Sequence, residues 1–506
     1  MWSFFVKKDK VLNSKQYNSD HTSFLKEYAD YKSTAHIDSL RSKEFKRLDA
    51  EGHVYLDFTG GGLYADKQVA QHAAQLAGNL YGNPHSSNPT SQKATAITES
   101  ARDYVLQYLN TNRDEYICIF TPNASGALKL LGEAYPFAEG GHLLLTFDNH
   151  NSVNGIREFA RKKGAGFNYT PIHKSDLRID KEELHRNLDR NVSGKNKLFA
   201  FPAQSNVSGV KHDLEWIKTA QDKGWDVLLD AAAFVPSDRL DLSRHKPDFV
   251  SVSFYKIFGY PTGLGCLLIK REAFAKLSRP WFAGGTITIV SVQGDSYYHD
   301  KDHAKFEDGT INYLDIPAIE IGLRHIESVG IDSIATRIRC LTGWTLKQIR
   351  NLKHANGLPL IKVYGPLDTE SRGGTISMNF FDNEGDMYDF FEVEGTANGQ
   401  NISLRSGCFC NPGIDETNHG FEASELKEYF SQTGAKDYFD LIEATGKRRG
   451  AVRISFGYVS NFRDAFQFIE FAKTFLNKQR PASSEQPQSH VAETTERVNS
   501  HEAVLG

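Results

Sequence analysis

Short apolar runs that alternate with amphipathic stretches limit the fold of this chain more than any other feature. The apolar runs that read as buried strands are 143–145, 198–201, 227–229 and 249–252. Helical patterns lie between them, for example at 153–163 and 214–223, and a strand at 54–58 precedes a run of three glycines. Parallel strands buried on both faces read as nearly continuous apolar runs, and helices connect them. The sequence therefore predicts an α/β fold with a large, mostly parallel sheet.

A change of pattern near residue 311 predicts a second, smaller unit with an α+β arrangement. Long helices are expected at 317–329 and 331–352, strands at 361–364 and 375–380, and a closing helix at 462–477. The predicted divisions of the chain are an N-terminal arm at 1–48, a large α/β domain at 49–310, a small C-terminal α+β domain at 311–480 and a disordered tail at 481–506.

Composition argues against several classes of partner. The 506 residues carry a net charge of −4, which gives no reason to expect a nucleic acid or a membrane surface. No segment approaches the roughly 18 apolar residues that span a bilayer, and residues 1–10 lack the apolar stretch of a signal peptide. The five cysteines are thinly spread and odd in number, which favours reduced thiols. We therefore expect a cytoplasmic protein that acts on a small molecule.

Lys256 and Asp230 are the most informative pair of charged residues. Lys256 follows the apolar run 249–252 and precedes a glycine-rich loop, and an amine held there in a partly desolvated position can form a Schiff base. Asp230 ends the run 227–229, where an acid points into the crevice in which α/β sheets bind ligands. The ordinary alternatives are a solvated lysine and a helix cap. Together, however, the two residues match pyridoxal 5′-phosphate (PLP), which needs a lysine for its aldehyde and a carboxylate for its ring nitrogen.

Residues 405–413, RSGCFCNPG, form a second cluster around Cys408 and Cys410. The glycine, asparagine and proline content predicts a loop with a turn at 411–413. No metal site is indicated, because no second Cys or His pair lies nearby at zinc spacing. The cysteines are therefore reactive thiols or small residues of a structural loop. Arg453 lies in an alternating strand, where an inward arginine needs an anionic partner, either a ligand or a structural salt bridge.

These segments resemble the class V aminotransferases, and within them the cysteine desulfurases, above all the desulfurase-like N-terminal domain of molybdenum cofactor sulfurases. The matching stretches are 55–57, 82–86, 121–130, 149–153, 202–206, 229–233, 253–265, 306–310 and 405–413. They follow family order over most of the chain. The resemblance implies the PLP-dependent transferase fold, that is, the aspartate aminotransferase-like fold of type I.

The resemblance also implies which residues bind the cofactor. They are Lys256, Asp230, Ala124, Ser125, His150, Asn206, Ser253 and Thr286. The serines and the backbone at Ala124 would hold the phosphate, and Thr286 would reach it from the second subunit of a homodimer. His150 would stack on the ring, although Asn149 is an alternative in the local register. Asn206 would approach the phenolic oxygen.

By the same resemblance, the catalytic residues are Lys256, His150 and Cys410, and Arg453 binds the substrate carboxylate. Arg405 would assist it or order the cysteine loop. The expected reaction removes sulfur from L-cysteine, gives alanine and leaves a persulfide on Cys410 for a sulfur acceptor. The alternative is a PLP-dependent C–S lyase or another amino-acid transformation, such as elimination, decarboxylation or carbon–carbon bond formation.

Overall fold

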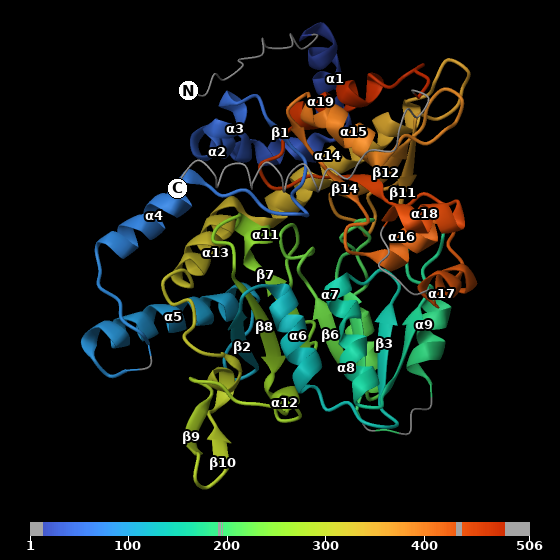
Figure 1. Ribbon diagram of the computed structural model, residues 1–506. Helices are drawn as coiled ribbons and strands as arrows, with labels where there is room; N and C mark the ends of the chain where they lie inside the picture. Colours follow the sequence, from blue (N-terminus) through green and yellow to red (C-terminus); the bar gives the residue numbers. More distant parts are fainter. Residues whose placement is uncertain (1–13, 85, 191–193, 195, 432–437, 481–506) are drawn as a thin grey trace, which may run out of the picture.

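A seven-stranded sheet with the order β2-β8-β7-β6-β5-β3-β4 forms the centre of the larger part of the computed structural model (Figure 1). The strands are β2 (Tyr116–Thr121), β3 (His142–Thr146), β4 (Gly166–Thr170), β5 (Lys197–Pro202), β6 (Asp226–Asp230), β7 (Phe249–Ser253) and β8 (Gly265–Lys270). Neighbours from β4 to β7 pair in parallel, whereas β8 pairs antiparallel with both β2 and β7. The four strands expected from the apolar runs are β3, β5, β6 and β7, so the predicted mostly parallel sheet is confirmed.

The structure describes residues 14–84, 86–190, 194, 196–431 and 438–480. The predicted tail at 481–506 and the start of the predicted arm lie outside these residues. None of the helices in the described ranges is long and apolar enough to cross a membrane.

Both faces of the large sheet are covered. The helices α6 (Ala124–Ala134) and α8 (Ile156–Lys162) pack with Leu143 and Leu145 in one core, whereas Leu144 belongs to the core on the other face. The helix expected at 153–163 begins earlier, as α7 (Asn151–Asn154), and is interrupted at Gly155 before α8. It starts early because the His150 side chain accepts a hydrogen bond from the Ser152 N–H and caps the helix.

A smaller antiparallel sheet with the order β11-β12-β15-β14 lies in the C-terminal part (Figure 1). Its strands are β11 (Ile361–Tyr364), β12 (Thr375–Phe380), β14 (Arg405–Gly407) and β15 (Ala451–Ser455). The helices predicted around it are α13 (Pro317–Val329), α14 (Ile331–Asn351) and α19 (Phe462–Lys473). The strand expected at 54–58 is shorter: β1 (Val54–Tyr55) pairs with β13 (Ile402–Ser403), outside the large sheet. The predicted boundaries at residues 48 and 310 stay predictions.

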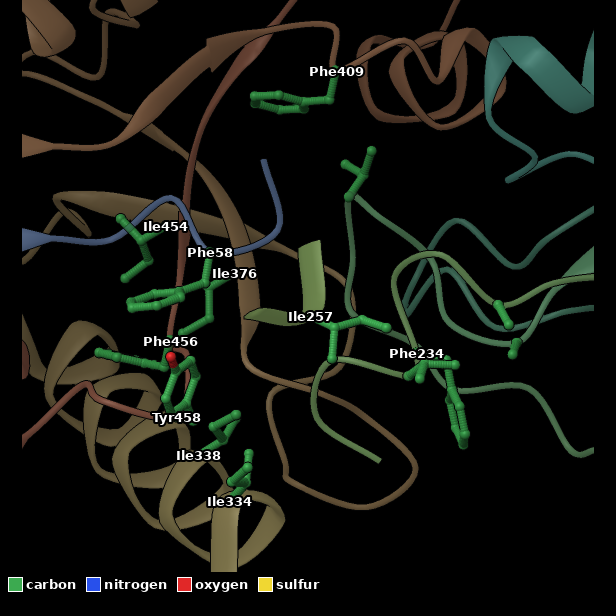
Figure 2. Close-up of a cluster of buried hydrophobic side chains, with 14 of the residues drawn as sticks. Phe58, Phe234, Ile257, Ile334, Ile338, Ile376, Phe409, Ile454, Phe456 and Tyr458 are labelled. Carbon is green, nitrogen blue, oxygen red and sulfur yellow. The ribbon is translucent and has the colours of Figure 1, made fainter. Parts of the chain in front are cut away.

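One apolar cluster joins segments from distant parts of the sequence (Figure 2). Phe58 lies beside Ile376, Ile454 and Phe456 of the small sheet region, and Ile338 of α14 lies below them. Lys256 lies on the helical turn that contributes Ile257 to the same cluster. Lys256 is therefore next in sequence to a residue of the core cluster to which both sheets contribute.

The N-terminal residues form helices that pack against the C-terminal part. They include α1 (Ser14–Glu27) and α2 (Ala35–Glu44). Phe24 stacks on Phe462 with ring centroids 4.8 Å apart. Arg41, which is 3% exposed, binds both oxygens of the buried Asp464 at the start of α19. These contacts attach the N-terminal segment to α19.

Replacing Asp464 with alanine should lower the free energy of unfolding by about 3–5 kcal/mol, because it leaves the Arg41 charge buried without this partner. Asp49→Ala is the matched control, since Asp49 pairs with the same arginine but its side chain is 41% exposed. It should cost about 0–1 kcal/mol. Urea unfolding of both variants measures the two losses, and equal losses would contradict this account of the buried pair.

Candidate active site

Lys256 lies on the short helix α11 (Phe254–Phe258), directly after β7 ends at Ser253. Burial lowers the pKa of its amine, and the Arg453 guanidinium lowers it further, whereas the Asp230 carboxylate opposes both effects. The helix ends at Gly259, whose φ of +81° favours glycine. A side chain there would meet the backbone of residue 63 at 2.5 Å. The local sequence thus fixes a half-buried amine whose pKa lies below that of an ordinary lysine.

Asp230 ends β6, the strand next to β7 in the sheet. Its side chain is 9% exposed. One carboxylate oxygen, Oδ1, accepts hydrogen bonds from Ser251 Oγ at 2.9 Å and from the Ala232 N–H at 3.1 Å. These contacts hold a carboxylate at the carboxyl end of the sheet, on the same side as Lys256.

A cavity of about 290 Å³ brings most of the predicted cofactor residues together. Those that line it are Ala124, Ser125, His150, Asn206, Asp230, Ser253 and Lys256. Thr286 is the exception: it is fully buried elsewhere, and its hydroxyl donates to the Ala283 carbonyl at 2.8 Å. The single chain therefore does not bring Thr286 to the cavity, and its contribution from a second subunit stays a prediction.

One end of the cavity is the N-terminus of α6. Asn123 caps this helix by accepting the Gly126 N–H at 2.9 Å, and Ser125 Oγ lies 2.6 Å from Ser152 Oγ of α7. Gly265, the first residue of β8, packs so closely that a Cβ there would lie 2.6 Å from the Asn123 carbonyl carbon. Free N–H groups at a helix N-terminus attract anions, so this end of the cavity suits a phosphate.

His150 lines the same cavity as Asp230. Burial lowers the pKa of its imidazole, against the effect of the Asp230 carboxylate, so the ring is neutral near pH 7. Its Nδ1 accepts the Ser152 N–H at 3.1 Å, which leaves the proton on Nε2. Asn149, the alternative in the sequence, is fully buried and donates to the Ala200 carbonyl at 2.9 Å. The cavity wall is formed by His150 and not by Asn149.

The cysteine loop lies against this wall and is held by its backbone. The carbonyl of Cys408 accepts the Asn411 N–H, that of Phe409 accepts Asn206 Nδ2 at 2.8 Å, and that of Cys410 accepts the N–H of residue 151 at 2.7 Å. Phe409 and Cys410 both have left-handed backbone angles, with φ of 55° and 54°. Such angles are costly for non-glycine residues and are common at functional sites.

The turn predicted at 411–413 is wrong, because a helix, α16 (Pro412–His419), begins there. Asn411 is its N-cap and Pro412 its first residue. Asparagine and proline are favoured in turns and also at these two helix positions, which explains the error.

The two thiols differ in environment. Cys408 is half-buried, and burial together with the nearby Asp415 carboxylate raises the pKa of its thiol to about 12. Cys410 is exposed. Only a thiolate is a good nucleophile, so the surroundings of Cys408 keep it unreactive near neutral pH.

Two arginines share one carboxylate beside the loop. Asp57 accepts from Arg453 Nη2 at 3.0 Å and from Arg405 Nη2 at 2.7 Å. Arg453 is 3% exposed, its guanidinium lies 4.8 Å from the centre of the Phe409 ring, and its buried Nε has no hydrogen-bond partner among the described residues. A structural salt bridge is therefore present, and Nη1 of the same guanidinium donates to the Asn206 carbonyl at 3.0 Å.

Sequence reasoning missed several residues of the site. Asp57 is one, and Gln204, Tyr255 and Thr262 of the cavity wall are others. The Gln204 amide donates to the Ala233 carbonyl at 3.0 Å and is 3% exposed. Asp57 and Gln204 both lie in segments that carried the family resemblance, which was the available signal.

Comparisons with known proteins identify relatives of this chain. The family model described as aminotransferase class-V matches residues 54–467. Molybdenum cofactor sulfurase of Solanum lycopersicum is 36% identical over 490 residues, covering 90% of this chain and 60% of the relative. The Homo sapiens molybdenum cofactor sulfurase is 36% identical over 461 residues, which cover 85% of this chain and 50% of the relative. The chain thus spans about half the length of the curated relatives it matches.

Solved structures share the fold. A cysteine desulfurase from Thermococcus onnurineus superimposes with a TM-score of 0.71 at 24% identity, covering 86% of this chain and 97% of that one. A C-DES mutant with glycine covalently linked to its PLP cofactor gives a TM-score of 0.65 at 15% identity. The match covers 86% of this chain and 99% of that one.

Proposed function

Because this chain belongs to the class-V aminotransferase family, we propose that it is a PLP-dependent cysteine desulfurase-like enzyme. One observation carries the proposal: a single cavity gathers the Lys256 amine, the Asp230 carboxylate, the neutral His150 ring and the N-terminus of α6. An exposed thiol, Cys410, lies on the loop that is bonded to its wall. This set provides for cofactor binding and for a sulfur nucleophile at the same place.

The residues of the cavity fit PLP by their chemistry. Asp230 is a buried carboxylate that can keep a pyridine nitrogen protonated, and Lys256 is a desolvated amine for the aldehyde. Ser125, Ser253 and the backbone N–H groups at Ala124 are donors for the phosphate. When bound, PLP supplies an electron sink that lowers the barrier to removing a proton from the substrate Cα.

The side chains of this chain do the remaining work. Lys256, with its lowered pKa, accepts the Cα proton. We propose that the Arg453 guanidinium, which pairs with Asp57, binds the substrate carboxylate, and Arg405 pairs with the same aspartate. The Cys410 thiolate attacks the substrate sulfur, so an S–S bond forms as the C–S bond breaks. The C–S electron pair stays with Cβ, which takes up a proton, and Lys256 returns the proton to Cα, so that alanine is released.

We propose L-cysteine as the substrate and a separate sulfur acceptor for the Cys410 persulfide. The matched relatives are named for sulfuration of the molybdenum cofactor, and a neighbour of the same fold is named for cysteine desulfuration. The exposure of Cys410 supports transfer, because an acceptor can reach its sulfur.

We further propose a homodimer in the cytoplasm. The hairpin of β9 (Ile287–Ser291) and β10 (Ser296–His299) follows Thr286 and carries exposed apolar side chains, with Val292 96% and Tyr298 72% exposed. Such a patch fits burial against a second copy, which would bring Thr286 to the other cavity. All five cysteines are free thiols, which supports a reducing compartment.

The test is the product that purified, PLP-loaded protein forms from L-cysteine in the presence of a reductant. We expect alanine and sulfide in equal amounts, because the reductant releases the persulfide sulfur. Pyruvate and ammonia instead of alanine would identify a C–S lyase and overturn the desulfurase proposal. Absorbance of bound cofactor, recorded on the same sample, tests the PLP assignment separately.

A further inference from the structure

A second polar cavity lies apart from the proposed active site. It has a volume of about 230 Å³ and is lined by the basic side chains Lys211, Arg339 and Arg372, by one carboxylate, Asp238, and by four hydroxyl residues. The hydroxyls are those of Ser237, Thr336, Thr369 and Ser371. A wall of cations and hydroxyl groups is the donor set that oxyanions require.

Arg372 is the residue that distinguishes this cavity from an ordinary charged surface. Its side chain is 4% exposed, and its Nη groups donate to the carbonyls of residues 208, 366 and 375. Its Nε has no acceptor, and no ion pair joins it to a carboxylate within the part of the chain that the structure describes. Burial lowers the pKa of its guanidinium to about 10. The Asp368 carboxylate acts on this guanidinium without a direct ion pair. A buried charge without a directly bonded counter-ion is costly, so the position favours an anion that arrives from outside.

Each of the two neighbouring cations has a carboxylate partner. Lys211 pairs with Asp238 at 2.6 Å, and Arg339 pairs with Asp30 at 3.1 Å, although its side chain is 49% exposed. Arg339 therefore gives the cavity an exposed edge from which an anion can enter. The cavity suits one compact oxyanion group better than a long ligand, because its volume is small.

We propose that this cavity binds a phosphate group, either as the free ion or as the phosphate of a small monoester. Bound there, the anion bridges two segments of the chain. Lys211 follows the loop that carries Asn206, and the backbone of residue 372 pairs with that of residue 210. Ser237 and Ile338 also line the small void behind Lys256. Phosphate binding thus stabilises the part of the active-site wall that borders the small void beside Lys256. This role is separate from the proposed reaction.

The test uses the PLP-loaded protein, in which the cofactor's own phosphate occupies the other anion position. Isothermal titration with inorganic phosphate, and separately with glycerol 3-phosphate, at constant ionic strength should show one saturable site per chain with Kd of about 1 mM or below. Tighter binding of inorganic phosphate would identify the free ion as the ligand. Tighter binding of glycerol 3-phosphate would identify a phosphate monoester. Absence of saturable binding for both overturns the proposal.

Three variants locate the site. Arg372→Gln and Arg339→Gln should each weaken phosphate binding at least about tenfold, which corresponds to about 1.4 kcal/mol. Arg339→Gln keeps the test valid if Arg372→Gln does not fold, because Arg339 is half-exposed. Arg178→Gln is the matched control, since Arg178 pairs with Asp368 nearby but does not line the cavity. Equal binding by the wild type, Arg339→Gln and Arg178→Gln would overturn the proposal.

Discussion

Lys256→Ala should lower the rate of alanine formation from L-cysteine by at least about 10³-fold, because it removes the base that takes the Cα proton. It also removes the amine to which the cofactor is attached. Borohydride reduction followed by mass spectrometry measures that attachment. The wild-type peptide that contains Lys256 should gain the mass of the reduced cofactor, whereas no peptide of the variant should gain it.

Lys270→Ala is the control for this experiment. Lys270 ends β8 and pairs with Glu272 at 2.9 Å, outside the cavity. That variant should keep wild-type activity and covalent labelling at Lys256. Labelling of another lysine in the wild type, or activity of Lys256→Ala within tenfold of wild type, would show that the amine has been assigned to the wrong residue.

Cys410→Ser should abolish alanine formation and persulfide labelling while leaving the cofactor absorbance unchanged. The side chain is exposed and lies on the loop beside the cavity, so its loss removes the sulfur nucleophile without disturbing the cofactor contacts. Product analysis and a persulfide-specific alkylation assay measure the two losses.

Cys408→Ser is the matched control, two residues away in the same loop. Because burial and Asp415 hold the pKa of the Cys408 thiol near 12, this thiol stays protonated and its replacement should change the rate by no more than a few-fold. If Cys408→Ser abolishes the reaction and Cys410→Ser does not, the roles of the two cysteines are the reverse of those proposed.

Much of the fold was predictable because the local sequence of the core strands and long helices indicates which of their residues are buried. The bounds predicted for α13 are those observed, since Pro317 starts it and Gly330, with φ of +90°, follows its end. The hairpin of β9 and β10 was not predicted, because its apolar side chains face solvent in the single chain and give no alternation with a buried face. The two-residue strands β1 and β13 depend on a pairing between residues almost 350 positions apart, at 54 and 402.

The candidate site also contains residues that the sequence predicted and contacts that it did not. Asp230 ends β6, and Lys256 lies three residues after the end of the adjacent strand β7, so the order of apolar runs along the chain was enough to bring them together. The pairing of Asp57 with Arg405 and Arg453 was not predictable, because three separate segments meet there only in the folded chain. The predicted roles of Arg453 and Thr286 remain predictions, and the variants described above address the thiol and the amine directly.

The carboxylate shared by the two arginines has a consequence for which amino acids the site admits. Two guanidinium groups and the Asp57 carboxylate together carry a single net positive charge beside the cysteine loop. That charge matches one α-carboxylate. A dicarboxylic amino acid would bring a second negative charge toward Asp57, and like charges that close in a partly desolvated site repel strongly. With Arg453 as the proposed partner of the substrate carboxylate, we therefore expect Asp57 to disfavour aspartate and glutamate relative to amino acids with neutral side chains, such as cysteine.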